Sequence, residues 1–452
     1  MHEASGLSEE AYAHYEGTAR FWRAWQYFEK VKLFGAVPWY DSPIDPEDMV
    51  ALYKPRDSRE YVMERVLEDL DFACTHCYDS GSWINSARIN RYIALAYKSR
   101  VCLFEGTYRK YHSVDPSTGK PWEDREAADR FLRAAADAAR ELMDAGVYSI
   151  VNNPANVRTQ YRSLFTQEEV NYSEVIWARE MSIGMTTYHE LTWRYTSGSY
   201  GQRWSLYQDF VRTYLNLDGS RHETTAKSSP PSREPRLPAQ PEHHHPGYEK
   251  LVGGTSTPTP PDFTVTLTGY QVIKYNIDDK NYESAKVSYN SLPIIRYAEV
   301  LLNYAEAKFE LGAFNQTVAD QTINLLRDRA EVGRMTVAEI GSDFDPDRDP
   351  SIDPVLWEIR RERLIELMGE SFSFEDVRRW KKADWYVNKQ HYGAYVENAT
   401  AQGINSISLG ETGILKQGGT TEATASDLAA QGNAGHLYFI RTPASAGKGW
   451  LE

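Results

Sequence analysis

Cysteine is scarce in this sequence, and long apolar runs are missing from it. Its 452 residues include only 3 cysteines, too few for a disulfide framework. Cys74 and Cys77 form a C-x-x-C pair, but no second pair completes a zinc site, so we predict a structural role. Cys102 lies in an apolar helical run and is predicted to be buried. No apolar run reaches the about 20 residues of a membrane-spanning helix, and Met1 does not begin a signal peptide.

Basic residues are fewer than acidic residues. The chain has 50 Lys and Arg against 64 Asp and Glu, a net charge of −14, which argues against nucleic acid or an anionic membrane as a main partner. Phosphate-binding loops, nucleophile elbows and zinc-protease helices are missing, and no spacing singles out a glycosidase pair. We therefore predict no catalytic residue and no cofactor. The run from His243 to His245 predicts a solvated loop and no metal site, because adjacent residues cannot easily all face one ion.

The abundant residues are aromatic: 30 Tyr, 15 Phe and 12 Trp. Tyr and Trp combine a flat apolar face with a polar edge, which suits both protein interfaces and sugar rings. We expect most of these rings to pack between helices.

Residues 293–331 predict a helical hairpin. An apolar stripe at helical spacing runs from Tyr297 through Leu301 to Leu311, and Gly312 then ends the helix. A second periodic run, 318–330, follows after a short link, so the two helices must lie antiparallel. This is a hairpin of the tetratricopeptide type, with the small residue of its second helix displaced. The polar residues of the first helix fall largely on the side opposite the stripe; they are Glu299, Asn303, Glu306 and Glu310.

Four further helices are predicted, over residues 8–34, 58–72, 89–104 and 130–142. The apolar row of the first consists of Ala11, Tyr15, Ala19, Trp22, Trp25, Phe28 and Val31. Between 148 and 291 helical periodicity fades, except near 206–215. Short strands are predicted there at 174–178 and 263–267.

A second helical block, 359–384, is rich in paired charges. Glu358 with Arg361 and Arg363 with Glu366 have the i,i+3 spacing of helix ion pairs. The block predicts a salt-bridged scaffold and not an anion site; its other charges are Arg360, Glu362, Glu370, Asp376, Arg378 and Arg379.

Five segments in order resemble the SusD-like (RagB/SusD) family of outer-membrane nutrient-binding lipoproteins. The first and most recognisable segment is LPIIRYAEVLLNYAEAKFELG, together with INLLRDRAEV, which follows it as the next helix of the family does. The second segment is IRRERLIELMGESFSFEDVRRWKKAD. The other three are FWRAWQYFEKVKLFGAVPWYDSP, LYQDFVRTYLNLDGS and REPRL. The terminal HLYFIRTP resembles the closing strand of the family.

The resemblance implies a function and a location. It implies a mainly α fold, with a tetratricopeptide-like scaffold, large irregular loops and a few short strands. It also implies binding of a glycan at the cell surface and delivery to a SusC-like TonB-dependent transporter in the outer membrane. Family members start with a lipoprotein signal and further helices, and attachment to the membrane would require the lipid anchor that is missing from this chain. We expect either a shortened sequence or a departure from the family at the N-terminus.

Four regions are predicted within one compact unit. Residues 1–147 form N-terminal helical hairpins, 148–291 a loop-rich insertion with the candidate ligand site, 292–387 C-terminal hairpins, and 388–452 an irregular end. Two functional alternatives stay open beside glycan binding: a peptide- or protein-binding scaffold, and a glycosidase.

The candidate ligand-binding residues are aromatic. Trp193, Tyr195, Tyr200 and Trp204 lie in a Gly- and Ser-rich loop without helical periodicity, so they are less easily explained as core. Trp39, Tyr40, Tyr78 and Trp83 lie at helix-to-loop junctions. Family members place glycan-binding rings on separate loops at varying positions, so the resemblance fixes none of them, and each ring could also be structural.

Overall fold

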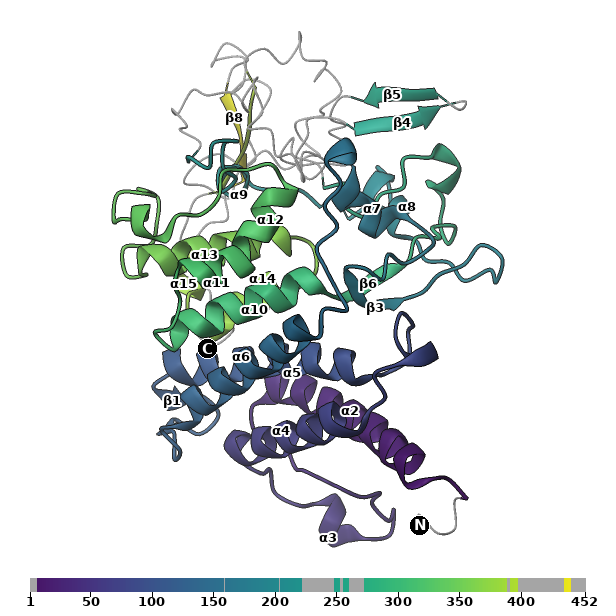
Figure 1. Ribbon diagram of the computed structural model, residues 1–452, viewed down its shortest axis with the longest axis vertical. Coiled ribbons are helices and arrows are strands. Elements are labelled where there is room, and N and C mark those ends of the chain that lie inside the picture. The colour runs from purple at the N-terminus through teal and green to yellow at the C-terminus, as the bar shows by residue number, and fades with distance from the viewer. Residues whose placement is uncertain are drawn as a thin grey trace.

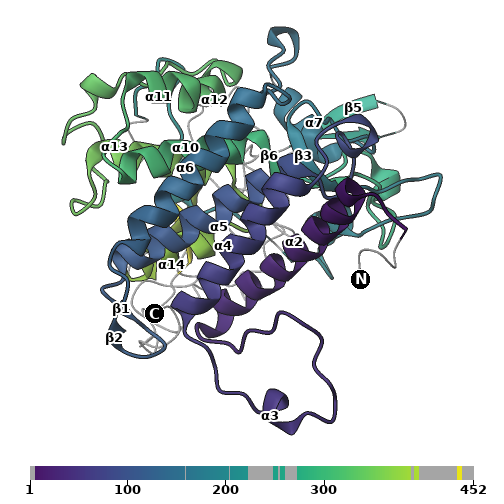
Figure 2. The same cartoon turned by 60° about the horizontal axis from the view of Figure 1, so that its bottom comes forward.

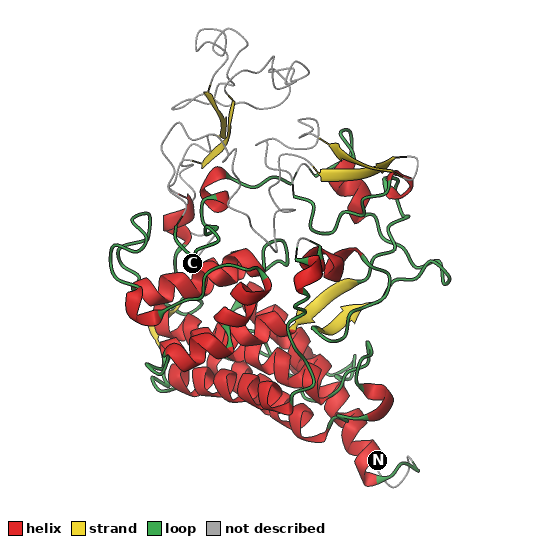
Figure 3. Cartoon of the chain, turned by 45° about the horizontal axis from the view of Figure 1, so that its top comes forward, coloured by secondary structure: helices red, strands yellow, loops and turns green. Residues whose placement is uncertain are grey.

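The computed structural model describes residues 6–157, 159–202, 204–221, 248–252, 255–259, 272–387, 391–396 and 435–439. Helices gather at one end of the molecule, while most strands and long loops lie at the other (Figure 3). The mainly helical prediction is confirmed. No helix within these ranges is both long and apolar enough to cross a membrane. The loop predicted at His243–His245 and the strand predicted at 263–267 lie outside the described residues.

The N-terminal part consists of four long helices that run side by side (Figure 2). They are α2 (Glu9–Phe34), α4 (Arg59–His76), α5 (Arg91–Tyr111) and α6 (Ala127–Ala145). All four were predicted, each within a few residues at its start. Ser8, Ser58 and Asn90 begin three of them by accepting a backbone N–H three residues ahead. A short helix, α3 (Met49–Leu52), projects on the loop between α2 and α4 (Figure 2).

The buried face of α2 differs from the predicted one. The residues that contact the core are His14, Gly17, Phe21, Ala24, Tyr27, Phe28, Val31 and Lys32. Tyr15 and Trp22 from the predicted apolar row instead remain 52% and 41% exposed. Phe28 and Val31 of the predicted row are buried as expected. In the first half of α2 the buried row starts one residue earlier, at His14, which a polar residue at its start concealed.

The predicted hairpin of residues 293–331 is present. Strand β6 (Leu292–Arg296) leads into α10 (Tyr297–Glu310), and Gly312 follows with a φ of +69°, the left-handed conformation that suits glycine. The second predicted helix is two short ones, α11 (Gln316–Gln321) and α12 (Ile323–Arg329), which meet at Thr322. Three more helices follow: α13 (Pro354–Glu366), α14 (Ser373–Arg379) and α15 (Ala383–Val387).

Helix α10 is buried on all sides, because its polar face is covered as well as its apolar stripe. α6 and α5 contact it from one side and α13 from another (Figure 1). Glu299 pairs with Arg100 at 2.6 Å, and Glu306 pairs with Arg379 at 2.6 Å. Asn303 accepts from Arg363 at 2.8 Å. The polar residues predicted opposite the stripe therefore join α10 to its neighbours.

The charged block at 359–384 was predicted correctly as a scaffold, but one of its pairs was wrong. Arg361 does pair with Glu358. Arg363 pairs with Asp376 at 2.9 Å and not with Glu366. A partner from another helix replaces the i,i+3 partner of Arg363 here, because buried carboxylates are stabilised by donors from more than one element.

Loops and small sheets make up the rest of the described chain. Strand β3 (Val175–Arg179), as predicted, pairs antiparallel with β6. The other sheets are antiparallel two-stranded pairs: β1 (Val114–Asp115) with β2 (Lys120–Pro121), β4 (Tyr248–Val252) with β5 (Thr255–Thr259), and β7 (His391–Val396) with β8 (Gly435–Phe439). Short helices α7 (Gln160–Thr166), α8 (Leu191–Thr196) and α9 (Gln208–Val211) lie between them.

A buried charge network fixes the loop region to the helices. Arg296, at the end of β6, contacts Glu174 at 2.9 Å, Glu366 at 2.8 Å and Glu370 at 2.6 Å. Arg329 of α12 reaches the same Glu174 at 2.9 Å. Since Glu174 directly precedes β3, these contacts hold the small sheet against α12 and α13. Burial alone would raise the pKa of Glu370, but Arg296 and Lys274 lower it to about 2.

Candidate functional site

The predicted aromatic loop forms an exposed cluster, here called the loop cluster: Trp193, Tyr200 and Trp204. Trp193 lies on α8, and its ring centroid is 5.5 Å from that of Tyr200. Tyr200 is 69% exposed and Trp204 41% exposed, while Trp193 is half-buried. Trp193 and Tyr200 are held close together at the surface and offer an apolar area on which a ligand ring can stack.

Tyr195 supports this cluster from beneath. It is only 6% exposed, and its centroid lies 4.7 Å from that of Trp204 at an angle of 64°. Burial raises its pKa well above the usual tyrosine value. Tyr195 therefore belongs to the core of the loop region, and we leave it out of the ligand-contacting set.

Helix α8 is fixed by hydrogen bonds to the segment before β6. Thr192 Oγ1 accepts from the backbone N–H of Ile277 at 3.1 Å, and the Thr192 N–H donates to Ser288 Oγ at 3.2 Å. His189 uses both ring nitrogens: Nδ1 accepts from the Leu191 N–H at 3.1 Å, and Nε2 donates to the Asn290 carbonyl at 2.8 Å. The loop cluster thus stands on a rigid support although its own sequence is irregular.

A second exposed aromatic surface, here called the helix platform, consists of Tyr15, Trp22 and Trp83. Tyr15 and Trp22 are seven residues apart on α2, two helical turns, so they share one face. Trp83, half-buried in the loop after α4, has its ring centroid 6.5 Å from that of Tyr15. Trp22 rests on Trp177 of β3, at 5.7 Å between centroids. The guanidinium of Arg88 lies 5.3 Å from the Trp83 ring and adds a donor at this surface.

His14 lies at the base of the helix platform. Its ring stacks on Tyr78 at 4.1 Å and meets Trp83 edge-on at 4.2 Å. Nδ1 accepts the Tyr78 N–H at 3.1 Å, while the buried Nε2 has no hydrogen-bond partner among the described residues. Burial lowers the pKa of His14, so the ring is neutral at pH 7. A neutral imidazole packs against Tyr78 and Trp83 without the cost of a buried charge.

The remaining predicted rings have structural contacts. Trp39 is 6% exposed and lies 4.2 Å from Tyr27 between centroids, so no open face is left for a ligand. Tyr40 is half-buried, and its hydroxyl donates to the Ala51 carbonyl at 2.5 Å. Tyr78 is half-buried beneath Trp83. Of the predicted residues at helix-to-loop junctions, Trp83 is the one that belongs to the helix platform.

Sequence reasoning missed Tyr15 and Trp22 as site candidates, since both matched the apolar period of α2. The signal that could have found them is the row His14, Gly17, Phe21, Ala24, which fits the same period and leaves both aromatic residues outside it.

The three cysteines are buried and free, as predicted for a structural role. Burial raises the pKa of Cys77 to about 11 and that of Cys102 to about 12. Within the described ranges, no three His, Cys, Asp or Glu side chains gather as a metal ion would require.

The fold is shared with solved structures of one class, the SusD-like proteins. A SusD-like protein from Bacteroides fragilis has a TM-score of 0.65 at 23% identity, covering 88% of this chain and 74% of that one. A SusD-like carbohydrate binding protein from the same species has 0.64 at 20%, covering 97% and 78%. Surface glycan-binding protein A from Bacteroides fluxus has 0.53 at 19%, covering 85% and 71%.

Residues 173–413 match the SusD family, and the chain belongs to that family. No curated protein matches the chain. The resemblance drawn from the five sequence segments is therefore confirmed. Because the identities to these solved structures are below 25%, the structures support the fold and nothing further.

Proposed function

We propose that this chain binds an oligosaccharide at the cell surface and passes it to a SusC-like TonB-dependent transporter. The observation that carries the proposal is the loop cluster, in which the exposed Tyr200 and Trp204 and the half-buried Trp193 lie on a rigid support. A sugar ring has apolar C–H faces and polar edges, so it can stack on such rings while its hydroxyls meet nearby polar groups. Membership of the SusD family and the carbohydrate-binding names of similar structures support this choice of ligand.

Polar groups stand beside the loop cluster in the way that sugar hydroxyls require. Arg194 lies over the Trp193 ring at 5.2 Å, and its guanidinium is held by Glu190 at 2.6 Å. Such a paired arginine keeps further donors for a ligand.

The helix platform is proposed as a second contact surface for the same ligand class. Tyr15 and Trp22 expose rings along two turns of α2, and the half-buried Trp83 lies beside Tyr15, so the surface suits an extended chain of sugars more than a single ring. Arg88 beside Trp83 supplies a hydrogen-bond donor.

The proposed docking surface for the transporter is at the other end of α2. Exposed large side chains occur at the end of α2 and on and just after α3: Leu33, Phe34, Met49, Val50, Leu52 and Tyr53. An apolar centre of this kind is typical of a stable protein interface. The loop that carries α3 projects from the helices and is accessible to a large partner (Figure 2). We place the protein at the outer membrane, facing outward, on the basis of this partner.

Retention of the purified chain on immobilised polysaccharides tests the proposal. We expect retention by at least one polysaccharide, without release of reducing ends, and loss of retention in a Trp193→Ala/Tyr200→Ala variant. Tyr53→Ala, which removes an exposed ring far along the chain from both aromatic surfaces, is the matched control and should be retained like the wild type.

Three results would contradict the proposal. Release of reducing ends would indicate a glycosidase. Binding of peptides with no binding on a full glycan array would indicate a peptide-binding scaffold. Equal retention of the double variant would place the glycan site away from the loop cluster.

A further inference from the structure

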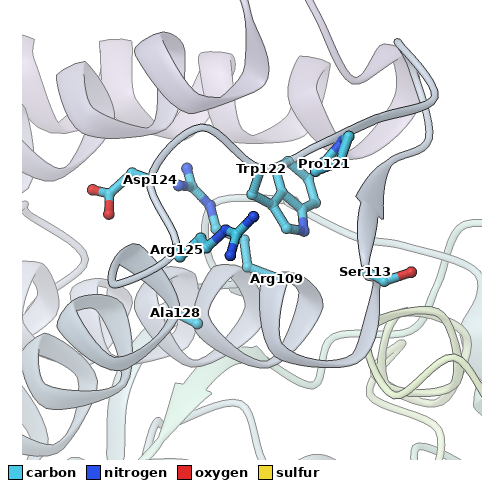
Figure 4. Close-up of a pocket in the computed structure, with 7 residues that line it drawn as sticks. All are labelled: Arg109, Ser113, Pro121, Trp122, Asp124, Arg125 and Ala128. Carbon is cyan, nitrogen blue, oxygen red and sulfur yellow. The ribbon is translucent and has the colours of Figure 1, made fainter.

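A small pocket of about 210 Å³ lies between the end of α5, the β1–β2 hairpin and the start of α6 (Figure 4). It is lined by Arg109, Ser113, Pro121, Trp122, Asp124, Arg125 and Ala128. Trp83 precedes the start of α5, whereas Arg109 lies in its last turn. The 21 residues of α5 span about 30 Å, so the pocket is distinct from the helix platform.

Arg109 lines this pocket and has one unpaired donor. Its side chain is buried, with the residue 4% exposed. Nε donates to Glu105 at 2.7 Å, and Nη1 lies 3.7 Å from Glu60. Nη2 is buried and has no hydrogen-bond partner among the described residues. Buried guanidinium donors are normally satisfied, so this nitrogen marks a position where an acceptor is missing.

Arg125 brings a second guanidinium to the same space. It is exposed, and within the described part of the chain its side chain forms no hydrogen bond or ion pair. Figure 4 shows the side chains of Arg109 and Arg125 converging beside the Trp122 ring, while the Asp124 carboxylate and the Ser113 hydroxyl turn away. The unpaired charge of Arg125 beside a second guanidinium favours an anion at this position.

The carboxylates nearby are already engaged. Asp124 pairs with Arg130 at 2.7 Å. Glu105 lies between Arg59 and Arg109, at 2.6 and 2.7 Å. Glu60 accepts the backbone N–H groups of residues 123 and 124 at 3.2 and 3.0 Å. Glu105 and Glu60 therefore offset much of the charge of Arg109. Arg125 has no carboxylate partner among the described residues, which leaves its guanidinium available to the anionic group of a ligand.

We propose that this pocket binds the carboxylate of a small acidic sugar, of the size of one hexuronate ring. A planar guanidinium fork matches a carboxylate with two parallel hydrogen bonds. The Trp122 ring is fixed by donation of Nε1 to the His112 carbonyl at 2.5 Å and forms an apolar wall for a sugar ring. The volume lies below the about 300 Å³ at which pockets for larger ligands begin, which favours a single ring. The inference does not depend on the aromatic surfaces.

Calorimetric titration of the full chain with sodium glucuronate tests this site. We expect saturable binding to the wild type and binding about 10- to 100-fold weaker in Arg125→Gln, which removes one charge-assisted contact. Arg125 is exposed, so this variant should fold normally. Arg133→Gln, which changes an exposed arginine of α6 that does not line the pocket, is the matched control and should bind like the wild type.

Two further ligands test which chemical group the site recognises. Glucose, which lacks the carboxylate, should not bind, and sodium sulfate should compete more weakly than glucuronate. The proposal is overturned if the wild type shows no saturable binding, if Arg125→Gln binds as tightly, or if glucose binds equally well. Tighter binding of sulfate than of glucuronate would also overturn it, because the pocket would then be a simple anion site.

Discussion

Glu306 and Arg379 form a buried, two-pronged ion pair, although 73 residues separate them along the chain. The two Nη–Oε distances are 2.7 and 2.6 Å, and Trp380 Nε1 donates to the same carboxylate at 2.6 Å. Burial alone would raise the pKa of Glu306, but Arg379, Arg360 and Arg363 lower it to about 2. The pair joins α10 to α14, so the two most recognisable sequence segments of the family meet in one contact.

Removing one partner of this pair should strongly destabilise the fold. We expect Arg379→Met to lower the free energy of unfolding by about 3–5 kcal/mol, because the buried Glu306 then loses its two-pronged partner and keeps only the more distant Arg360, at 3.9 Å. The double variant Glu306→Leu/Arg379→Met should recover part of that loss. Urea denaturation measures both, and Arg334→Met, at an exposed pair with Asp328, should leave the midpoint unchanged. A small effect of Arg379→Met would mean that water satisfies Glu306.

Leu301 tests the packing of α10. The side chain is fully buried, and we expect Leu301→Ala to cost about 2–5 kcal/mol of unfolding free energy, the range for a buried leucine. Leu33→Ala, at an exposed position on α2, is the control for helix propensity and should have little effect on the urea midpoint. An unchanged midpoint in Leu301→Ala would contradict the burial of this stripe.

The helices were predictable because their period and caps are local features. Ser8, Ser58 and Asn90 mark starts that the structure places at the following residue. The α10 hairpin was equally visible from its stripe and from Gly312. What period alone does not show is which side of a helix faces the core when aromatic residues occur on two neighbouring rows. For that reason Tyr15 and Trp22 of α2 were assigned to the wrong face.

The site was less predictable because exposure of a ring depends on tertiary contacts. Trp39 and Tyr195 have the same loop-like sequence surroundings as Trp83 and Trp204, yet the first two are buried. The side chains that bury them belong to other parts of the fold; Tyr27 of α2, for example, packs on Trp39. The pairing of Arg363 with Asp376 in place of Glu366 has the same origin, since a third element decides it.

Acid should destabilise the support of the loop cluster through His189. Burial lowers the pKa of His189 below its usual value of 6.5, and Nδ1 already accepts the Leu191 N–H, so a second proton has no acceptor. A histidine whose pKa is lower in the folded than in the unfolded chain contributes stability above pH 6.5, and this stability is lost as the pH falls through the unfolded value.

We therefore expect a smaller free energy of unfolding at pH 5 than at pH 7.5, and part of that difference should vanish in His189→Gln. His14 and His112, whose pKa values are also lowered by burial, account for a further part. An NMR titration of the His189 ring gives the pKa directly, and a value at or above 6.5 would contradict the burial argument.

The cysteines should be unreactive in the folded protein. Cys74, Cys77 and Cys102 are buried, and burial raises each thiol pKa, so little thiolate is present at pH 8. We expect a thiol reagent such as DTNB to modify none of them in the native state and all 3 after denaturation. Fast modification of Cys77 in the native state would mean that the contact between α2 and the end of α4 opens.

The loop cluster and the helix platform can be separated by single substitutions. Trp193→Ala and Trp204→Ala should each weaken glycan binding by about 1–3 kcal/mol, the scale of a stacking contact, with little change in melting temperature. Trp22→Ala and Trp83→Ala test the helix platform in the same assay, with Tyr53→Ala as the control. Because Trp204 rests on buried Tyr195, a Tyr195→Ala variant should instead lower the melting temperature. Large melting losses in both Trp193→Ala and Trp204→Ala would show that those rings are core, and a binding loss confined to Trp22→Ala and Trp83→Ala would move the site to the helix platform.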